Sequence, residues 1–317
     1  MNDNNQSMEI DLVYLWVNGN DPAWQAKRQS ITGNAESKTS VNCKGRYADN
    51  GELKYSLRSI ELYAPWIRKI FIVTDNQVPE WLDTTNPKIQ IVDHTEILPS
   101  ESLPCFNSAL IEHFLYRIPG LSEHFLYAND DMLLNRPTTP ETFFRHDGFP
   151  IVRMNRKRFR KFKLWFREKI LGKKLNNHVR LIANAAKLVE NKYGRYIGSR
   201  THHNIDAYNR SDYERVHNIF KDDIASTLTH HIRDNKDIER QIYSYVPLIE
   251  KRAHVEYVDR ETSFRIQIHK LSQYRKLKEI NPIFLCMNDS EFAHDPDRKR
   301  SKDFLSERFP EKSKFEK

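Results

Sequence analysis

The first half of the chain contains four short runs of β-branched and aromatic residues. The runs are Ile10–Val17, Lys69–Thr74, Ile89–Val92 and His124–Ala128. Helical patterns of apolar residues separate them, at Gly51–Tyr63 and at Phe106–Arg117. Strands that alternate with helices form βαβ units and a mainly parallel sheet. The sequence therefore predicts an α/β fold.

Polar residues follow each of these runs. They are Asn18-Gly19-Asn20-Asp21, Asp75-Asn76, Asp93-His94 and Asn129-Asp130-Asp131. In an open α/β sheet, ligands bind beyond the carboxyl ends of the strands, so the polar residues collect where a site is expected.

The sharpest of these signals is Asn129-Asp130-Asp131. Two adjacent carboxylates repel each other and are costly to desolvate unless a cation lies between them. Mg²⁺ typically uses one or two carboxylates together with substrate phosphates. Asn288-Asp289 follows another short apolar strand, Ile283–Leu285, and offers a second oxygen-rich corner. Two such corners favour a metal site over simple capping of the next turn.

Asp49 and Glu52 have a purely structural interpretation. Their spacing fits a capping box at the start of the helix that follows, and capping alone would explain Asp49. For Asn50 and Glu52, both a structural and a functional role remain open.

The middle of the chain is strongly basic. Between Arg153 and Lys174 there are eleven Lys or Arg residues and one acid, Glu168. Phe159, Phe162, Phe166 and Ile170 recur at helical spacing. One interpretation is a helix packed on the body with a solvated basic back. The other is an interfacial helix or a cover over an anionic substrate. We predict that 8–150 and 195–317 form the catalytic α/β domain, and that 151–194 is a basic helical insertion.

Composition and missing motifs reduce the number of functional classes to which the chain could belong. The formal net charge of +8 suits a polyanionic, phosphate-bearing or membrane-surface partner. No apolar run reaches the ~20 residues that cross a bilayer. The first residues lack a signal-peptide pattern. The three cysteines have no paired spacing, which indicates free thiols. We therefore expect a cytoplasmic globular protein. Glycine-rich nucleotide loops and a Gly-x-Ser-x-Gly elbow are also missing.

Two histidine clusters could carry acid–base chemistry. They are Thr201-His202-His203-Asn204 and His230-His231-Ile232-Arg233. A histidine can accept a proton from an attacking hydroxyl, and an arginine can hold a phosphate with two hydrogen bonds.

Long blocks of the sequence resemble the Stealth family. Ile10–Pro22 resembles its first conserved region, and the second is matched by Arg46–Ile60, Ala64–Asp75, Leu103–Ser108 and Phe125–Asp131. His203–Ser211 resembles the third region, and Phe284–Asp289 with Phe309–Glu316 resembles the fourth.

This resemblance implies a nucleotide-sugar transferase-like, Rossmann-like α/β fold. It implies transfer of a hexose-1-phosphate or N-acetylhexosamine-1-phosphate from a UDP-sugar to a hydroxyl of a glycan or lipid-linked oligosaccharide. The products would be a phosphodiester and UMP, and Mg²⁺ or Mn²⁺ would assist. The bacterial branch of the family builds capsule and exopolysaccharide, with a location in the cytoplasm or at the inner face of the membrane.

The resemblance also assigns roles to residues. It places Asn129, Asp130 and Asp131 at the metal and the diphosphate, with Asp130, Asp131, Asn288 and Asp289 as metal ligands. It makes His203 the base and puts Arg233 on the transferring phosphate, with Asp131 also catalytic. The remaining substrate-binding positions are Asn18, Arg46, Asn50, Glu52, Arg58, Asn107 and His202. The family often has a His-x-Pro before the third-region histidine, where this chain has Arg200, Thr201 and His202, so both His202 and His203 are candidates for the base.

Two other functions fit parts of the sequence. An ordinary glycosyltransferase would use the same metal site and release UDP, and only the resemblance separates the two reactions. A nucleic-acid-binding module would explain the positive charge, but the acids concentrate at the expected site and no binding motif is present. We therefore expect no nucleic-acid partner.

Overall fold

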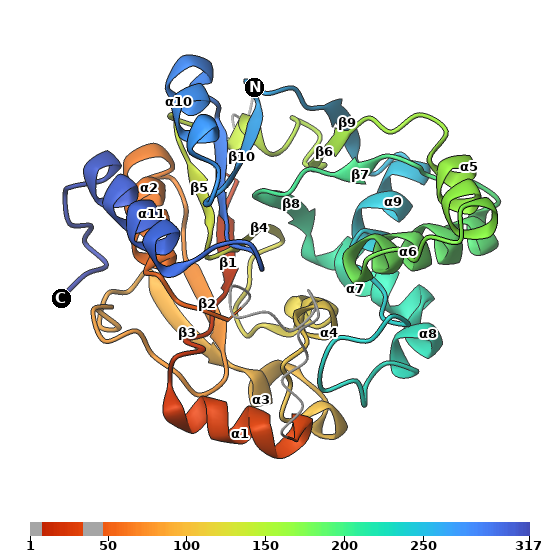
Figure 1. The fold of residues 1–317 in the computed structure, drawn as a ribbon, viewed down its shortest axis with the longest axis horizontal. Helices are drawn as coiled ribbons and strands as arrows, with labels where there is room; N and C mark the ends of the chain where they lie inside the picture. The colour runs from red at the N-terminus through yellow and green to blue at the C-terminus, as the bar shows by residue number, and fades with distance from the viewer. Residues whose placement is uncertain (1–7, 34–46) are drawn as a thin grey trace, which may run out of the picture.

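The computed structural model describes residues 8–33 and 47–317, and its centre is a five-stranded sheet (Figure 1). The strand order is β3-β2-β1-β4-β8, with the first four parallel and β8 antiparallel to β4. The bounds are β1 Ile10–Leu15, β2 Ile70–Thr74, β3 Ile89–Asp93, β4 His124–Asn129 and β8 Asp206–Asn209. The four strands predicted in the first half are confirmed, and so is the α/β class with a mainly parallel sheet.

Both faces of this sheet are buried, as the continuous apolar runs require. Along β1, Val13 packs into one core, while Ile10, Leu12 and Tyr14 pack into the core on the other face. The main helices are α1 Pro22–Thr32, α2 Glu52–Tyr63, α6 Asn177–Tyr193, α7 Arg210–Ile219, α9 Ile242–Ile249, α10 Leu271–Ile280 and α11 Asp295–Arg308. In the part of the chain that the structure describes, none of the helices is long and apolar enough to cross a membrane.

Two three-stranded sheets extend the central one. The first has the order β10-β11-β5 and the second β7-β6-β9. Their bounds are β5 Met132–Leu134, β10 Ser263–Gln267, β11 Phe284–Asn288, β6 Ile151–Asn155, β7 Arg200–Thr201 and β9 His254–Tyr257. Because β5 begins immediately after Asp131 and pairs with β11, the two predicted oxygen-rich corners lie next to each other.

The helix predicted over Phe106–Arg117 is broken. It consists of α4, Ser108–Glu112, and a 3₁₀ turn at Leu115–Arg117. His113 ends α4, and its ring hydrogen-bonds the Tyr243 hydroxyl at 2.9 Å and the Ile238 carbonyl at 3.0 Å. Contacts with a segment over 120 residues away therefore override the local periodicity. The other short helices are α3 His94–Ile97, α5 Arg160–Trp165 and α8 Lys221–Ala225, with 3₁₀ turns at Ser100–Ser102 and Pro140–Thr142.

The predicted capping box at Asp49 and Glu52 is wrong. Gly51 caps α2 with φ of 84°, a left-handed conformation that glycine adopts without steric cost. The Asp49 carboxylate accepts a hydrogen bond from the Gly51 amide at 2.7 Å. Glu52 is the first residue of the helix, and its carboxylate accepts from the backbone and side-chain nitrogens of Asn50, each at 2.8 Å.

The basic segment divides into two parts. Strand β6 and helix α6 belong to the body, because Val152, Met154, Ala185 and Val189 all pack in one of the main cores. Between them, α5 continues into a π-helical turn at Phe166–Ile170, and its aromatic side chains are exposed. The interpretation of this stripe as a packed core face is therefore wrong. The division into a catalytic domain and an insertion stays a prediction.

Candidate active site

The carboxyl edge of the central sheet opens into a cavity of about 510 Å³. Its walls include the ends of β1 and β4, which run parallel with Leu15 opposite Asn129. The end of β11, at Asn288 and Asp289, forms another wall. The cavity therefore lies where the strand pattern placed a ligand site.

Two adjacent half-buried carboxylates, Asp130 and Asp131, dominate one side of the cavity. Burial, and then the charge of Asp131, raise the pKa of Asp130 well above its ordinary value. Burial raises the pKa of Asp131 to about 6, against the lowering effect of the Cys286 thiol, whose Sγ donates to Asp131 Oδ2 at 3.3 Å. Glu52 also lines the cavity, and its pKa is raised to about 7, mainly by burial. The raised pKa values show that nearby positive charge does not offset the burial and mutual repulsion of these carboxyl groups.

The donor atoms at this edge fit a divalent cation. Asp131 Oδ1 is buried and has no hydrogen-bond partner among the described residues, so this oxygen is available to a cation. Donor atoms of Asp131, His203 and Cys286 all lie within 4.8 Å of one another. The predicted Asp289 also lines the cavity, but Arg298 already holds its carboxylate, at 2.8 and 3.2 Å. Cys286 and His203 are thus candidate ligands that the strand-end argument did not identify.

Both candidate histidines line the cavity, in different surroundings. Burial lowers the pKa of His203 to about 3, with further lowering by Arg265, Arg240 and Arg200. At neutral pH, His203 is therefore uncharged and able to ligate a metal or to accept a hydrogen bond from a hydroxyl, but a pKa this low makes it a weak base. His202 is fully enclosed, and its Nε2 lies 3.2 Å from the Ile205 carbonyl. The choice of His203 as the base remains a prediction.

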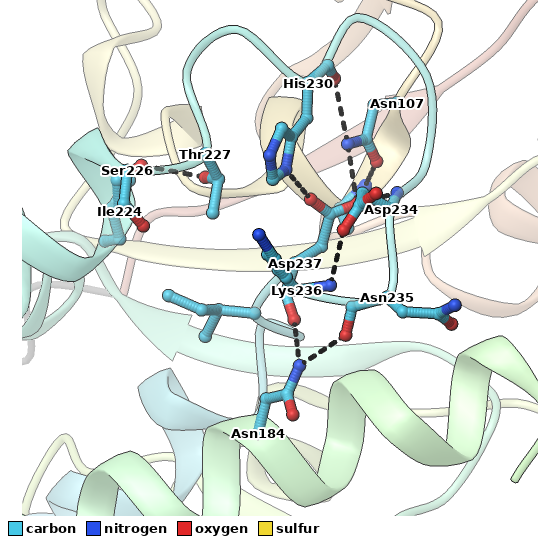
Figure 2. Close-up of polar contacts among 12 residues, drawn as sticks. Asn107, Asn184, Ile224, Ser226, Thr227, His230, Asp234, Asn235, Lys236 and Asp237 are labelled. Atoms are coloured by element: carbon cyan, nitrogen blue, oxygen red, sulfur yellow. Dashed lines mark hydrogen bonds and ion pairs between the residues drawn. The ribbon is translucent and has the colours of Figure 1, made fainter.

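Arg233 enters the cavity from a loop between α8 and α9. Its guanidinium donates to the Ser108 hydroxyl. Figure 2 shows how Asp237 organises this loop: its carboxylate accepts from the Asp234 amide at 2.8 Å and lies 2.6 Å from the His230 ring. Asn107 donates to the His230 carbonyl at 3.1 Å and to Asp237 at 2.8 Å.

A buried charge cluster surrounds Arg240 and was not predicted from the sequence. Its guanidinium lies 2.7 Å from Asp206 and 3.6 Å from both Glu112 and Glu239. Glu112, Glu239 and Arg240 line the cavity, as do Arg200 and Arg265. The adjacent charges Glu239-Arg240, directly before an apolar helix, were the available signal.

Several predicted binding residues lie outside the cavity lining. Asn107 is buried and uses its side chain to hold the Arg233 loop. Arg58 pairs with Glu316 through two contacts, of 2.7 and 2.8 Å, next to the C-terminus. Asn18 accepts from the Asn20 amide, and Asn50 reaches the cavity only through Glu52. Arg46 lies outside the described residues.

The remaining predictions fall on the cavity wall. Asn129, Asp130, Asp131, Glu52, His202, His203, Arg233, Asn288 and Asp289 all contribute to it. These residues come from segments separated by more than 230 positions, and the fold brings them together at one edge.

Much of the chain is similar in sequence to known proteins. Models of two conserved regions of Stealth proteins match residues 8–35 and 46–152. A capsular polysaccharide phosphotransferase of Haemophilus influenzae is 32% identical over 302 residues, covering 90% of this chain and 79% of the relative. An exopolysaccharide phosphotransferase of Lactiplantibacillus plantarum is 29% identical over 339 aligned positions, covering 98% and 96%. A crystal structure of the galactosyltransferase LgtC with donor and acceptor sugar analogues has a TM-score of 0.48 at 12% identity, over 96% of each chain.

The protein is therefore an enzyme, a transferase with an α/β fold. It belongs to the Stealth family. The resemblances to the first and second conserved regions are confirmed, while those to the third and fourth regions stay predictions.

Proposed function

We propose that this enzyme transfers a hexose-1-phosphate or N-acetylhexosamine-1-phosphate from a UDP-sugar to a hydroxyl of a glycan, in capsule or exopolysaccharide synthesis. The observation that carries the proposal is the composition of the cavity, which is lined by paired carboxylates, a guanidinium and a neutral histidine. Phosphoryl transfer asks a protein mainly for positioning and charge neutralisation. The names of the relatives support the same class of reaction.

Asp130 and Asp131, with Asn288 or Asp289, would hold Mg²⁺ or Mn²⁺. Bound there, the cation would supply positive charge beside the donor diphosphate. The buried, unpartnered Asp131 oxygen supports this placement. Because the Asp289 carboxylate is paired with Arg298, Asn288 is the better metal ligand of the two residues in this conformation. The Cys286 sulfur is near enough to contribute to the set, whereas His203 has a separate role in proton transfer.

In our proposal His203 accepts the proton of the acceptor hydroxyl. The hydroxyl oxygen attacks the phosphorus next to the sugar, forming a new P–O bond. The bond from that phosphorus to the bridging oxygen of the diphosphate breaks, and UMP leaves with the electron pair. Arg233 donates to the non-bridging oxygens, where negative charge is held during the transfer.

The acceptor would be a glycan or a lipid-linked oligosaccharide, and the enzyme would act in the cytoplasm. Glu52 and Asn129 line the cavity and are suited to bind hydroxyl groups of the donor. Asn18, Asn50 and Arg58 would support the donor site indirectly, from outside the lining.

The test is to identify the nucleotide released. Purified protein is incubated with Mg²⁺ or Mn²⁺, a panel of UDP-sugars and an oligosaccharide acceptor, and products are separated by anion-exchange chromatography. We expect UMP with one donor, and no release by the His203→Gln variant. Release of UDP would overturn the proposal and make the protein a glycosyltransferase. The His146→Gln variant, at an exposed position, is the matched control for substitution of a histidine.

A further inference from the structure

The segment between β6 and α6 exposes an unusual number of large apolar side chains. Phe159, Phe162, Trp165, Phe166, Ile170 and Leu171 have exposed fractions between 39% and 77%. Phe162 lies 5.8 Å from Trp165 and 6.1 Å from Phe166 between ring centroids, so the rings form one cluster. Soluble proteins seldom expose such a cluster unless it binds a partner.

Basic residues surround this cluster. The Lys and Arg residues between 156 and 174 are Arg156, Lys157, Arg158, Arg160, Lys161, Lys163, Arg167, Lys169, Lys173 and Lys174. The one acid in this stretch, Glu168, is neutralised by Arg180 of α6. Within the described part of the chain, one of these ten cations forms an ion pair: Lys161 lies 2.6 Å from Glu190. The surface therefore keeps a large positive charge.

Both ends of the segment are anchored in the cavity wall. Asn155 precedes it and His178 follows it, and both line the cavity. Arg160 packs closely against Gly198, two residues before Arg200, which also lines the cavity. Whatever binds the exposed segment is therefore held beside the active site. Figure 1 shows α5 at the edge of the molecule, on the opposite side of the view from α10.

We propose that residues 156–174 dock the enzyme on the surface of an anionic lipid bilayer. Phe and Trp side chains partition into the boundary between headgroups and acyl chains, and Lys and Arg are attracted to anionic headgroups. Nucleic acid would match the charge and could stack on the rings, but it offers no site for aliphatic Ile170 and Leu171. A bilayer accommodates both the aliphatic and the aromatic side chains.

This docking surface does not depend on the reaction that the active site performs. If the proposed function is correct, it would place the cavity beside acceptors that are anchored in the membrane by a lipid. Membrane binding and nucleotide release are separate measurements, so failure of one leaves the other standing.

The test is co-sedimentation of the full-length protein with vesicles, without nucleotide or metal. The vesicles contain phosphatidylcholine, either alone or with roughly 30 mol% of the anionic lipid phosphatidylglycerol. We expect binding to the anionic vesicles that weakens by about tenfold or more in the Lys163→Glu/Arg167→Glu/Lys169→Glu variant. The Phe162→Ser/Trp165→Ser variant, which keeps every charge, should also bind more weakly.

Matched controls separate this surface from total charge and hydrophobicity. Arg275, Lys276 and Lys278 are exposed on α10, so their triple Glu variant has the same net charge as the α5 triple variant. It should retain most of the vesicle binding, as should Leu62→Ser, which alters an exposed apolar residue elsewhere. Equal losses in the α5 and α10 triple variants would overturn the proposal. So would equal binding to neutral and anionic vesicles, or binding to duplex DNA with none to vesicles. Circular dichroism and melting temperature check that each variant is folded.

Discussion

At the scale of single residues, the sharpest prediction concerns Arg233. Replacing it by Lys keeps a positive charge but removes the planar pair of donors that fits a phosphate. We expect Arg233→Lys to lower the rate of UMP release by about 100-fold, the usual effect of losing one donor to a developing charge. The melting temperature should change little. Near-normal turnover in this variant would remove Arg233 from the transfer step, and Arg275→Lys on α10 is the matched control.

Asp131 tests the metal site without any turnover assay. Its carboxylate lies half-buried beside Asp130, Oδ1 has no partner among the described residues, and burial raises its pKa to about 6. Without metal, Asp131→Asn should therefore stabilise the protein at pH 7.5 by on the order of 2 kcal/mol, since it removes a charge that the folded state disfavours. Addition of Mg²⁺ or Mn²⁺ should raise the melting temperature of the wild type and of the exposed control variant Asp222→Asn on α8, but not that of Asp131→Asn. A metal-induced shift that persists in Asp131→Asn would place the cation elsewhere.

At the scale of elements, the sequence predicted the strands well and the helix ends poorly. The strands are apolar runs buried on both faces, and such runs are recognisable from composition alone. Helix ends depend on distant contacts: His113 ends α4 through Tyr243 and Ile238. At the start of α2, a glycine with φ of 84° replaced the expected capping box. The spacing of residues did not reveal either effect.

The loop that carries Arg233 gives a prediction at this scale. Asn107 holds the loop through the His230 carbonyl and Asp237, which follow it by 123 and 130 residues in the sequence. Asn107→Ala should cost about 1–3 kcal/mol of stability, because buried groups lose a partner. It should also lower the rate of UMP release, since a misplacement of about 1 Å at a reacting group can cost ~100-fold.

A double-mutant cycle distinguishes this role from direct substrate binding. If Asn107 acts by positioning Arg233, Asn107→Ala should have little further effect on the rate in the Arg233→Lys background. Additive losses in the double variant would instead indicate that Asn107 acts independently of Arg233. The control is Asn86→Ala, whose amide donates to the Lys314 carbonyl, away from the loop.

At the scale of the whole molecule, the site combines residues that the sequence could and could not predict. Asn129-Asp130-Asp131 and Asn288-Asp289 follow strands, so their place at the sheet edge was predictable. The position of Cys286 beside Asp131 depends on the antiparallel pairing of β11 with β5, and that pairing joins segments 150 residues apart. The same applies to the Arg240 cluster, whose partners lie on β8 and α4. A single sequence gives no register for such long-range pairs.

The C-terminal segment completes the molecule and supplies the last prediction. Glu316 forms two short contacts with Arg58 of α2, and the neighbouring backbone bonds to Trp81 and Asp83. The pKa of Glu316 is lowered to about 2: burial raises it, but the hydrogen bond from Arg58 and the Ser313 amide outweigh burial. The carboxylate therefore stabilises the folded state above the unfolded pKa of 4.5, and this contribution is lost as the pH falls towards 2.

We expect Glu316→Gln to lower the melting temperature at pH 7 by on the order of 5 °C. The difference from wild type should shrink between pH 4.5 and pH 2.5, because the wild-type carboxylate becomes protonated there in the unfolded state and then in the folded state. Thermal melts followed by circular dichroism across this range test the prediction, with the exposed Glu307→Gln of α11 as the control. A difference that stays constant with pH would mean that the shape of Glu316, not its charge pair with Arg58, holds the C-terminal segment against α2.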